Sequence, residues 1–203
     1  MRVIGRMMAV AVILLAGSAV LAQETGEKAP PKMSAEQQAM MEAWMKAATP
    51  GPQHQWLAKM AGTWSLEVKS WMDPKAPPTV STGDATMKMT MDGRYLKEKV
   101  NGTMMGAPFQ GLGFTGYDNI IKRYVSVWMD NMSTGIMRSE GAYDEATHTM
   151  TMTGTYVDPV SGKTKTMKGT SRYEGDNRVV FTYYDTTPDG TEYKSMEITY
   201  TRK

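Results

Sequence analysis

The residues best suited to chemistry are two histidines and an unusual number of methionines. The chain has 203 residues, with 2 His, 21 Met and no Cys. If the segment after Ala146 forms a strand, alternation puts His148, Met150 and Met152 on one face. One imidazole and two thioethers suit Cu(I), a soft ion. This set is a weak metal candidate, because Met also fills irregular cores as a flexible hydrophobic side chain.

A second ladder of thioethers has the same ambiguity. Met87, Met89 and Met91 alternate with polar residues, so a strand would carry all three on one face. His148 is also the one histidine expected on a strand and therefore the candidate for holding haem inside a barrel. His54 lies outside the expected strands, and we expect it to be a surface or capping residue. We favour the packing interpretation and expect no metal and no cofactor.

Catalytic patterns are not found in this sequence. The absence of Cys excludes a thiolate nucleophile, thiolate metal sites and disulfides. The sequence contains no G-x-S-x-G segment, and no Ser-His-acid set is indicated by spacing. Pairs of acids such as Asp130 and Glu140 are expected by chance in a chain with 21 acidic residues. We therefore expect a protein that is not an enzyme.

Ligand binding is the function that the residue pattern favours. A ten-stranded barrel encloses a cavity if its inward face is not filled. Alternation makes one set of side chains candidates to line an apolar pocket: Trp128, Met150, Met152, Phe181, Tyr183 and Tyr200. The alternative is that the same residues are simply the core of a filled barrel. A register error of one residue would move any of them to the outer face.

The elements that position these residues are short strands. From Gly62 onward, Thr, Tyr, Val and Met alternate with polar residues, and turn residues recur every 10 to 14 positions. We predict ten antiparallel strands, and Asp92-Gly93 reads as a tight primed turn between two of them. Because an open sheet of this size exposes two long edges, we predict closure into an up-and-down barrel. The expected strands cover about 63–72, 80–91, 94–103, 108–117, 122–131, 134–143, 147–157, 163–173, 177–185 and 191–202.

Two helices are expected before the barrel. Ser34 to Gln37 fits a capping box, and apolar residues then recur at three- and four-residue steps from Met40 to Ala48. A shorter helix is expected over Gln53 to Met60. We expect the first helix to dock on the barrel or to plug its mouth; the alternative is a helix that binds a partner or a membrane surface.

The N-terminus predicts export. Arg2 and Arg6 precede an apolar run from Met7 to Leu15, and Val20-Leu21-Ala22 fits the small-residue cleavage rule. The expected organisation is a signal peptide over 1–22, a flexible tether over 23–32, a helical segment over 33–61 and the barrel over 62–203. We expect the periplasm or the extracellular space as the location, with no membrane span after cleavage.

Removal of the signal peptide also changes the charge. The whole chain has 23 basic and 21 acidic residues, and the peptide carries two of the Arg residues and no acid. The mature chain is therefore formally neutral, which excludes the basic surface typical of nucleic-acid binders. The expected partner is a small apolar molecule, and the oligomeric state stays open.

Several short motifs resemble a known family. They are Gly62-Thr63-Trp64, Gly116-Tyr117-Asp118-Asn119, Trp128-Met129-Asp130-Asn131-Met132, Glu140-Gly141-Ala142-Tyr143-Asp144 and the C-terminal Ile198 to Lys203. Together they resemble the bacterial exported family catalogued as domain of unknown function 1579, over roughly residues 50–203. The resemblance implies a secretory protein with a barrel-like β fold and implies no activity.

The two ends of the expected barrel are also similar to calycins, the group of lipocalins and fatty-acid-binding proteins. In that group a Trp on the first strand closes one barrel end under an Arg from the last strand. The resemblance assigns these roles to Trp64 and Arg202. In the fatty-acid-binding members a Tyr and an Arg near this end anchor a carboxylate, but we expect Arg202 to be engaged by Trp64 instead.

Overall fold

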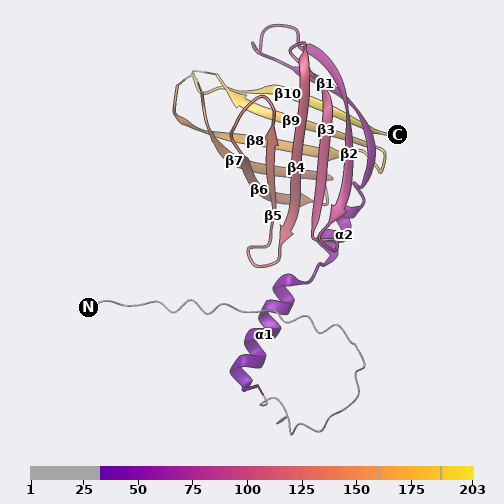
Figure 1. Cartoon of the computed structure of the whole chain (residues 1–203). Coiled ribbons are helices and arrows are strands. Elements are labelled where there is room, and N and C mark those ends of the chain that lie inside the picture. The colour runs from indigo at the N-terminus through magenta and orange to yellow at the C-terminus, as the bar shows by residue number, and fades with distance from the viewer. Residues whose placement is uncertain (1–32, 160, 188) are drawn as a thin grey trace, which may run out of the picture.

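The computed structural model describes residues 33–159, 161–187 and 189–203, so the expected signal peptide and tether lie outside the described residues. Two helices, α1 (Ala35–Ala48) and α2 (Pro52–Ala58), precede ten strands (Figure 1). The strands are β1 (Gly62–Ser70), β2 (Thr79–Thr90), β3 (Tyr95–Met104), β4 (Ala107–Asp118), β5 (Arg123–Asp130), β6 (Met137–Asp144), β7 (Thr149–Val157), β8 (Thr164–Tyr173), β9 (Arg178–Thr186) and β10 (Glu192–Arg202).

The strands close into one antiparallel barrel. Each strand pairs with its neighbours in sequence, and β1 pairs with both β2 and β10. The closing pair sets Trp64 opposite Arg202 and Leu66 opposite Tyr200. The predicted fold class, a ten-stranded up-and-down barrel, is therefore confirmed, and the ends of every predicted strand lie within three residues of those observed. Closure pairs both edges that an open sheet would leave exposed.

The core is concentrated at the barrel end that α2 covers. Leu57 on α2 is buried, and Met60 just after the helix joins the same cluster as Trp64, Leu66 and Val179. Trp56 enters this end from α2, and its ring lies 4.4 Å from that of Tyr143 between centroids. We call this the closed end of the barrel, and the opposite half the open half.

The tight primed turn lies at a different hairpin from the predicted one. Thr90 pairs with Tyr95, so the expected two-residue turn at Asp92-Gly93 is a four-residue loop, in which Met91 and Asp92 also have positive φ. Met91 is exposed there and does not continue the strand. The tight primed turn occurs instead at Met105-Gly106, where φ is 52° and 79°.

Close approach of two strands explains one glycine. A Cβ added at Gly141 would lie 1.8 Å from the carbonyl oxygen of Thr151 on β7, a backbone atom that cannot move aside. We expect Gly141→Ala to lower the free energy of unfolding by more than about 2 kcal/mol, measured by urea denaturation, because overpacking forces backbone shifts. The matched control is Gly135→Ala, where nothing lies within 4 Å, and we expect a change within about 0.5 kcal/mol. Equal stabilities of the two variants would contradict the close approach.

The first helix does not cover the barrel. Its predicted capping box is present: Gln37 N–H donates to Ser34 Oγ, and Ser34 N–H donates to Gln37 Oε1. None of its residues is buried, and Trp44 is 67% exposed. The contacts that tie it to the barrel are hydrogen bonds from the Asn119 side chain to the carbonyls of Ala47 and Thr49. The expectation that this helix docks on or plugs the barrel is therefore wrong.

Within the three described stretches of the chain, no helix is both long enough and apolar enough to cross a membrane.

Candidate functional site

Trp64 and Arg202 form the closed end of the barrel. Trp64 is fully buried, and its indole Nε1–H donates to the carbonyl of Met60 at 3.0 Å. The Arg202 guanidinium lies over the indole ring, 4.1 Å from its centroid. Its three nitrogens donate to the carbonyls of Ala61, Lys59 and Asp176 at 2.7, 2.7 and 2.9 Å. The guanidinium donors are therefore directed at the backbone of the closed end, away from the interior of the open half.

A layer of aromatic residues lies above this closure. The Trp56 ring, brought in by α2, contacts three tyrosines from β5, β6 and β8, which are Tyr124, Tyr143 and Tyr173. Burial raises the pKa of Tyr124 to about 12, so its hydroxyl stays protonated. Trp56 had no predicted role beyond its place in the helix expected over Gln53 to Met60. The layer therefore holds α2 against β5, β6 and β8.

The six residues predicted to line a pocket all face the barrel interior. Phe181 pairs with Ile198 and Tyr183 with Met196, and this register puts both on the face that carries Tyr200. Met150 belongs to the fully buried core, with 4% of its surface exposed. The other five, Trp128, Met152, Phe181, Tyr183 and Tyr200, are only partly buried. The structure thus brings the set together on the inner face, with Met150 in the packed core and Tyr200 at the closed end, where its ring meets that of Trp64 edge-on.

Trp128 lies across the inner wall of the barrel. Its indole occupies the space beside two glycines of β4, with ring atoms within 3 Å of where a Cβ would stand at Gly111 or Gly113. The indole Nε1–H donates to Asp130 Oδ2 at 2.9 Å, and the Phe109 ring stacks at 17° to the indole. These contacts hold the ring along the wall of the barrel.

The facing wall has a similar arrangement. The Phe181 ring lies about 3 Å from where a Cβ would stand at Gly169 of β8. Its centroid is 6.2 Å from that of Tyr183 on the same strand. Burial raises the pKa of Tyr183 to about 12, helped by the charge of Asp185. Both walls therefore present aromatic rings laid over glycines.

Glu98 is an inward-facing carboxylate that the sequence pattern did not single out. It alternates with the buried residues Leu96 and Val100 on β3, and it pairs with Met87 on one side and Gly113 on the other. Its Oε1 is buried and has no hydrogen-bond partner. Burial raises the pKa of Glu98 to about 7, and its hydrogen bond with the Tyr200 side chain lowers the pKa. Alternation with Leu96 and Val100 was the available signal.

The histidine–methionine metal set is not assembled. β7 begins at Thr149, and His148 lies in the preceding turn with φ of 49°, exposed and near the Tyr143 hydroxyl. The strand alternation on which the set of His148, Met150 and Met152 depended therefore does not extend to His148. The same fact removes His148 as an interior haem ligand. The Met87 ladder also loses its third member, because Met91 lies in a turn.

His54 is a buried capping residue. Its Nδ1 accepts the N–H of Gly51 at 3.0 Å at the start of α2, and its ring meets that of Tyr117 edge-on. Burial lowers the pKa of His54. The expected capping role is present, but a surface position is wrong because 6% of the residue is exposed.

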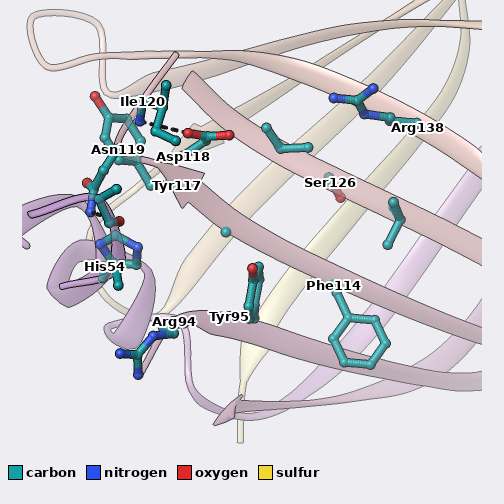
Figure 2. A pocket seen from close by; sticks show the side chains of 15 residues that line it. His54, Arg94, Tyr95, Phe114, Tyr117, Asp118, Asn119, Ile120, Ser126 and Arg138 are labelled. Carbon is teal, nitrogen blue, oxygen red and sulfur yellow. Dashed lines mark hydrogen bonds between the residues drawn. The ribbon is translucent and has the colours of Figure 1, made fainter. Parts of the chain in front are cut away.

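Two hollows lie near the helices. The larger, of about 460 Å³, is bordered by the end of α1 and by outward-facing residues of the barrel wall (Figure 2). Its lining includes Arg94, Tyr95, Phe114 and Arg138. The smaller, of about 260 Å³, lies between α2 and the β6–β7 turn and includes Trp56 and His148. Neither gathers the residues predicted from the sequence to line a pocket.

Over residues 33–159, 161–187 and 189–203, the structure holds no group of three His, Cys, Asp or Glu side chains arranged to bind a metal ion.

Comparison with known proteins places the fold. The chain is similar to the crystal structure of Rv2717c from M. tuberculosis, with a TM-score of 0.57 and 12% identity over 76% of this chain and 99% of that one. A redesigned β-barrel matches with a TM-score of 0.39 and 18% identity, over 72% of this chain and 94% of the design. No curated protein matches the sequence. A family model described as a protein of unknown function, DUF1579, matches residues 49–202. The chain therefore belongs to the DUF1579 family.

Proposed function

We propose that this protein binds a small apolar or amphipathic molecule in the open half of its barrel, without catalysing a reaction. The observation that carries the proposal is the uneven filling of the interior. Inward-facing residues at the closed end, such as Trp64 and Met150, are buried. The inward-facing rings of Trp128, Phe181 and Tyr183 keep part of their surface exposed. Exposed aromatic surface inside a barrel is typical of a pocket for an apolar ligand.

The sizes of the inward residues support an unfilled open half. A barrel of this strand number is filled only if bulky side chains meet across its axis. Several inward positions here carry Gly, and the nearby rings of Trp128 and Phe181 lie along the wall over those glycines. Hydroxyl groups add a polar component: Thr115 Oγ1 donates to Ser126 Oγ at 3.1 Å, a bond between inward positions of β4 and β5. The lining is therefore amphipathic.

Export is part of the proposal. Its support is the sequence of residues 1–22, in which Arg2 and Arg6 precede an apolar run and a small-residue cleavage motif. We propose the periplasm or the extracellular space as the place where the barrel meets its ligand.

A second candidate function is interaction with another envelope component. It is favoured by the apolar stripe of α1, whose members Met40, Met41, Trp44 and Met45 are each more than half exposed. A stripe of this kind suits a helix that lies in a groove or on a surface. This function would apply to α1 even if the barrel binds nothing.

The chain offers a matched pair of phenylalanines to test ligand binding. Phe181 faces inward, whereas Phe114 faces outward on β4, where Lys97 Nζ lies 5.9 Å from its ring centroid. We expect the purified protein to bind the neutral apolar probe N-phenyl-1-naphthylamine, followed by its fluorescence. Phe181→Ala is expected to weaken binding about tenfold, because it removes buried apolar contact.

The control is Phe114→Ala, for which we expect an unchanged dissociation constant. Absence of saturable binding by the unaltered protein would contradict the proposed function. An equal loss in both variants would show that the probe binds elsewhere and would contradict the interior site.

A further inference from the structure

We infer that the ligand of the open half carries an ammonium group and that this group reaches the Glu98 carboxylate at the border of the packed core. This inference rests on the proposed function and names the chemical class of its ligand. It goes beyond an apolar pocket, because it assigns the polar contact that would orient the molecule. Its basis is the pairing of Glu98, the charges of the interior and the ring that lies beside the carboxylate.

The Glu98 carboxylate can accept more hydrogen bonds than the protein gives it. A carboxylate accepts several hydrogen bonds. Within the described chain, the Glu98 carboxylate is hydrogen-bonded to the Tyr200 side chain. Oε1 is buried without a partner. A buried acceptor left unpaired costs free energy, and a ligand that donates to Oε1 would recover it.

The charges on the inner face of the barrel favour a cationic ligand. By strand alternation, Asp130 and Asp185 also face inward near the mouth of the open half. Two cations share the inward face. Arg202 donates to backbone carbonyls at the closed end, and Lys165 forms an ion pair with Asp158 at 2.8 Å. A ligand carboxylate would therefore meet acidic groups, whereas a ligand cation would meet an opposite charge.

An aromatic surface lies beside the Glu98 carboxylate. Glu98 pairs with Gly113, Gly113 pairs with Trp128, and the indole lies over that glycine. The carboxylate and the indole face are thus neighbours on the same wall. A cation next to both would gain an ionic hydrogen bond and a cation–π contact. An alkyl chain attached to it would extend along Phe181 and Tyr183.

Three probes of equal chain length test the inference: octylamine, 1-octanol and octanoate. We expect isothermal titration calorimetry at pH 8 to show octylamine binding at least about tenfold more tightly than octanoate, with 1-octanol between them. Glu98→Gln keeps the shape of the side chain and removes its charge. In this variant we expect octylamine to bind about tenfold more weakly and 1-octanol to change less than about threefold.

The matched control is Glu140→Gln, which removes an exposed carboxylate on the outer face of β6; we expect it to leave all three affinities unchanged. Equal affinity for the three probes, or preference for octanoate, would overturn the ammonium inference and leave the proposed function standing. Failure of all three to bind, together with the neutral naphthylamine probe, would overturn the proposed function itself. An equal loss in both Glu variants would also overturn the role of Glu98.

A measurement on the unaltered protein checks the same point without any variant. The titratable groups that interact with Glu98 are Tyr200 on β10 and Tyr173 on β8, while its strand partners Met87 and Gly113 do not titrate. Both tyrosines stay neutral at acidic pH, so Glu98 alone governs the charge at this point. We expect octylamine affinity to fall progressively between pH 8 and pH 5, by about tenfold in total, which is the loss expected for Glu98→Gln, as Glu98 becomes protonated. An affinity that is constant over this range would overturn the inference.

Discussion

Replacement of Trp64 by alanine is expected to lower the free energy of unfolding by about 3 to 5 kcal/mol, measured by urea denaturation and circular dichroism. Trp64 is fully buried, so the substitution leaves a large cavity at the closed end. It also removes the donor to the Met60 carbonyl and the ring beneath the Arg202 guanidinium. These contacts join the chain before β1 to the end of β10, so their loss affects the closure of the barrel.

A second variant keeps this prediction testable if the alanine protein does not accumulate in soluble form. Trp64→Phe retains an aromatic ring and removes the Nε1 donor, and we expect it to cost about 1 to 3 kcal/mol. The matched control is Trp44→Ala on α1, whose side chain is 67% exposed. We expect that variant to change stability by less than about 0.5 kcal/mol. Equal effects at Trp64 and Trp44 would show that Trp64 does not close the barrel.

The strands and their closure were predictable because their determinants are local. Alternation with period two and turn residues at regular intervals give both the number of strands and their antiparallel order. β8 is an example: it was predicted over 163–173 and runs from Thr164 to Tyr173. The same alternation placed Trp128, Phe181 and Tyr183 on the inner face. In each case, neighbouring residues along one strand were enough to decide the face.

The turns were less predictable because several non-glycine residues adopt positive φ. His148 and Met91 do so at 49° and 50°. Such residues are uncommon in this region, so alternation alone continued each strand into its turn. That error produced the histidine–methionine metal set and the three-membered Met87 ladder. Both sets fail for the same reason.

The filling of the interior and the position of α1 depend on contacts between distant segments. Sequence alternation gives the face of Glu98 but not the unpaired state of its Oε1 atom, which depends on the neighbours supplied by β4, β8 and β10. An apolar stripe on α1 was predicted correctly, but a stripe does not specify what covers it. His54 shows the same limit, because its burial depends on how α2 sits against Tyr117.

Removal of the Glu98 charge is expected to stabilise the protein at alkaline pH. The pKa of Glu98 is about 7 in the folded protein against 4.5 for an ordinary Glu. The folded state therefore binds this proton more tightly than the unfolded state, and the unfolding free energy falls as pH rises from 4.5 to 7. A difference of this size corresponds to about 3 kcal/mol. Glu98→Gln cannot ionise and should not show this loss.

We therefore expect Glu98→Gln and the unaltered protein to have unfolding free energies within about 1 kcal/mol of each other at pH 4, where both side chains are neutral. At pH 8 we expect the variant to be more stable by about 3 kcal/mol. The lowered pKa of His54 acts in the opposite direction below pH 6.5, but it is common to both proteins and cancels in their difference. Urea denaturation at several pH values measures that difference directly.

The control for this prediction is Glu140→Gln, which should follow the unaltered protein at every pH because this carboxylate is exposed. A constant difference between Glu98→Gln and the unaltered protein from pH 4 to pH 8 would contradict a buried Glu98 carboxylate with a raised pKa. The expected result would mean that Glu98 weakens the fold at neutral pH. A group that weakens the fold and can satisfy a ligand donor is typical of binding sites, where stability is sacrificed for function. The stability measurement thus tests, independently of any probe, the property that makes Glu98 a ligand anchor.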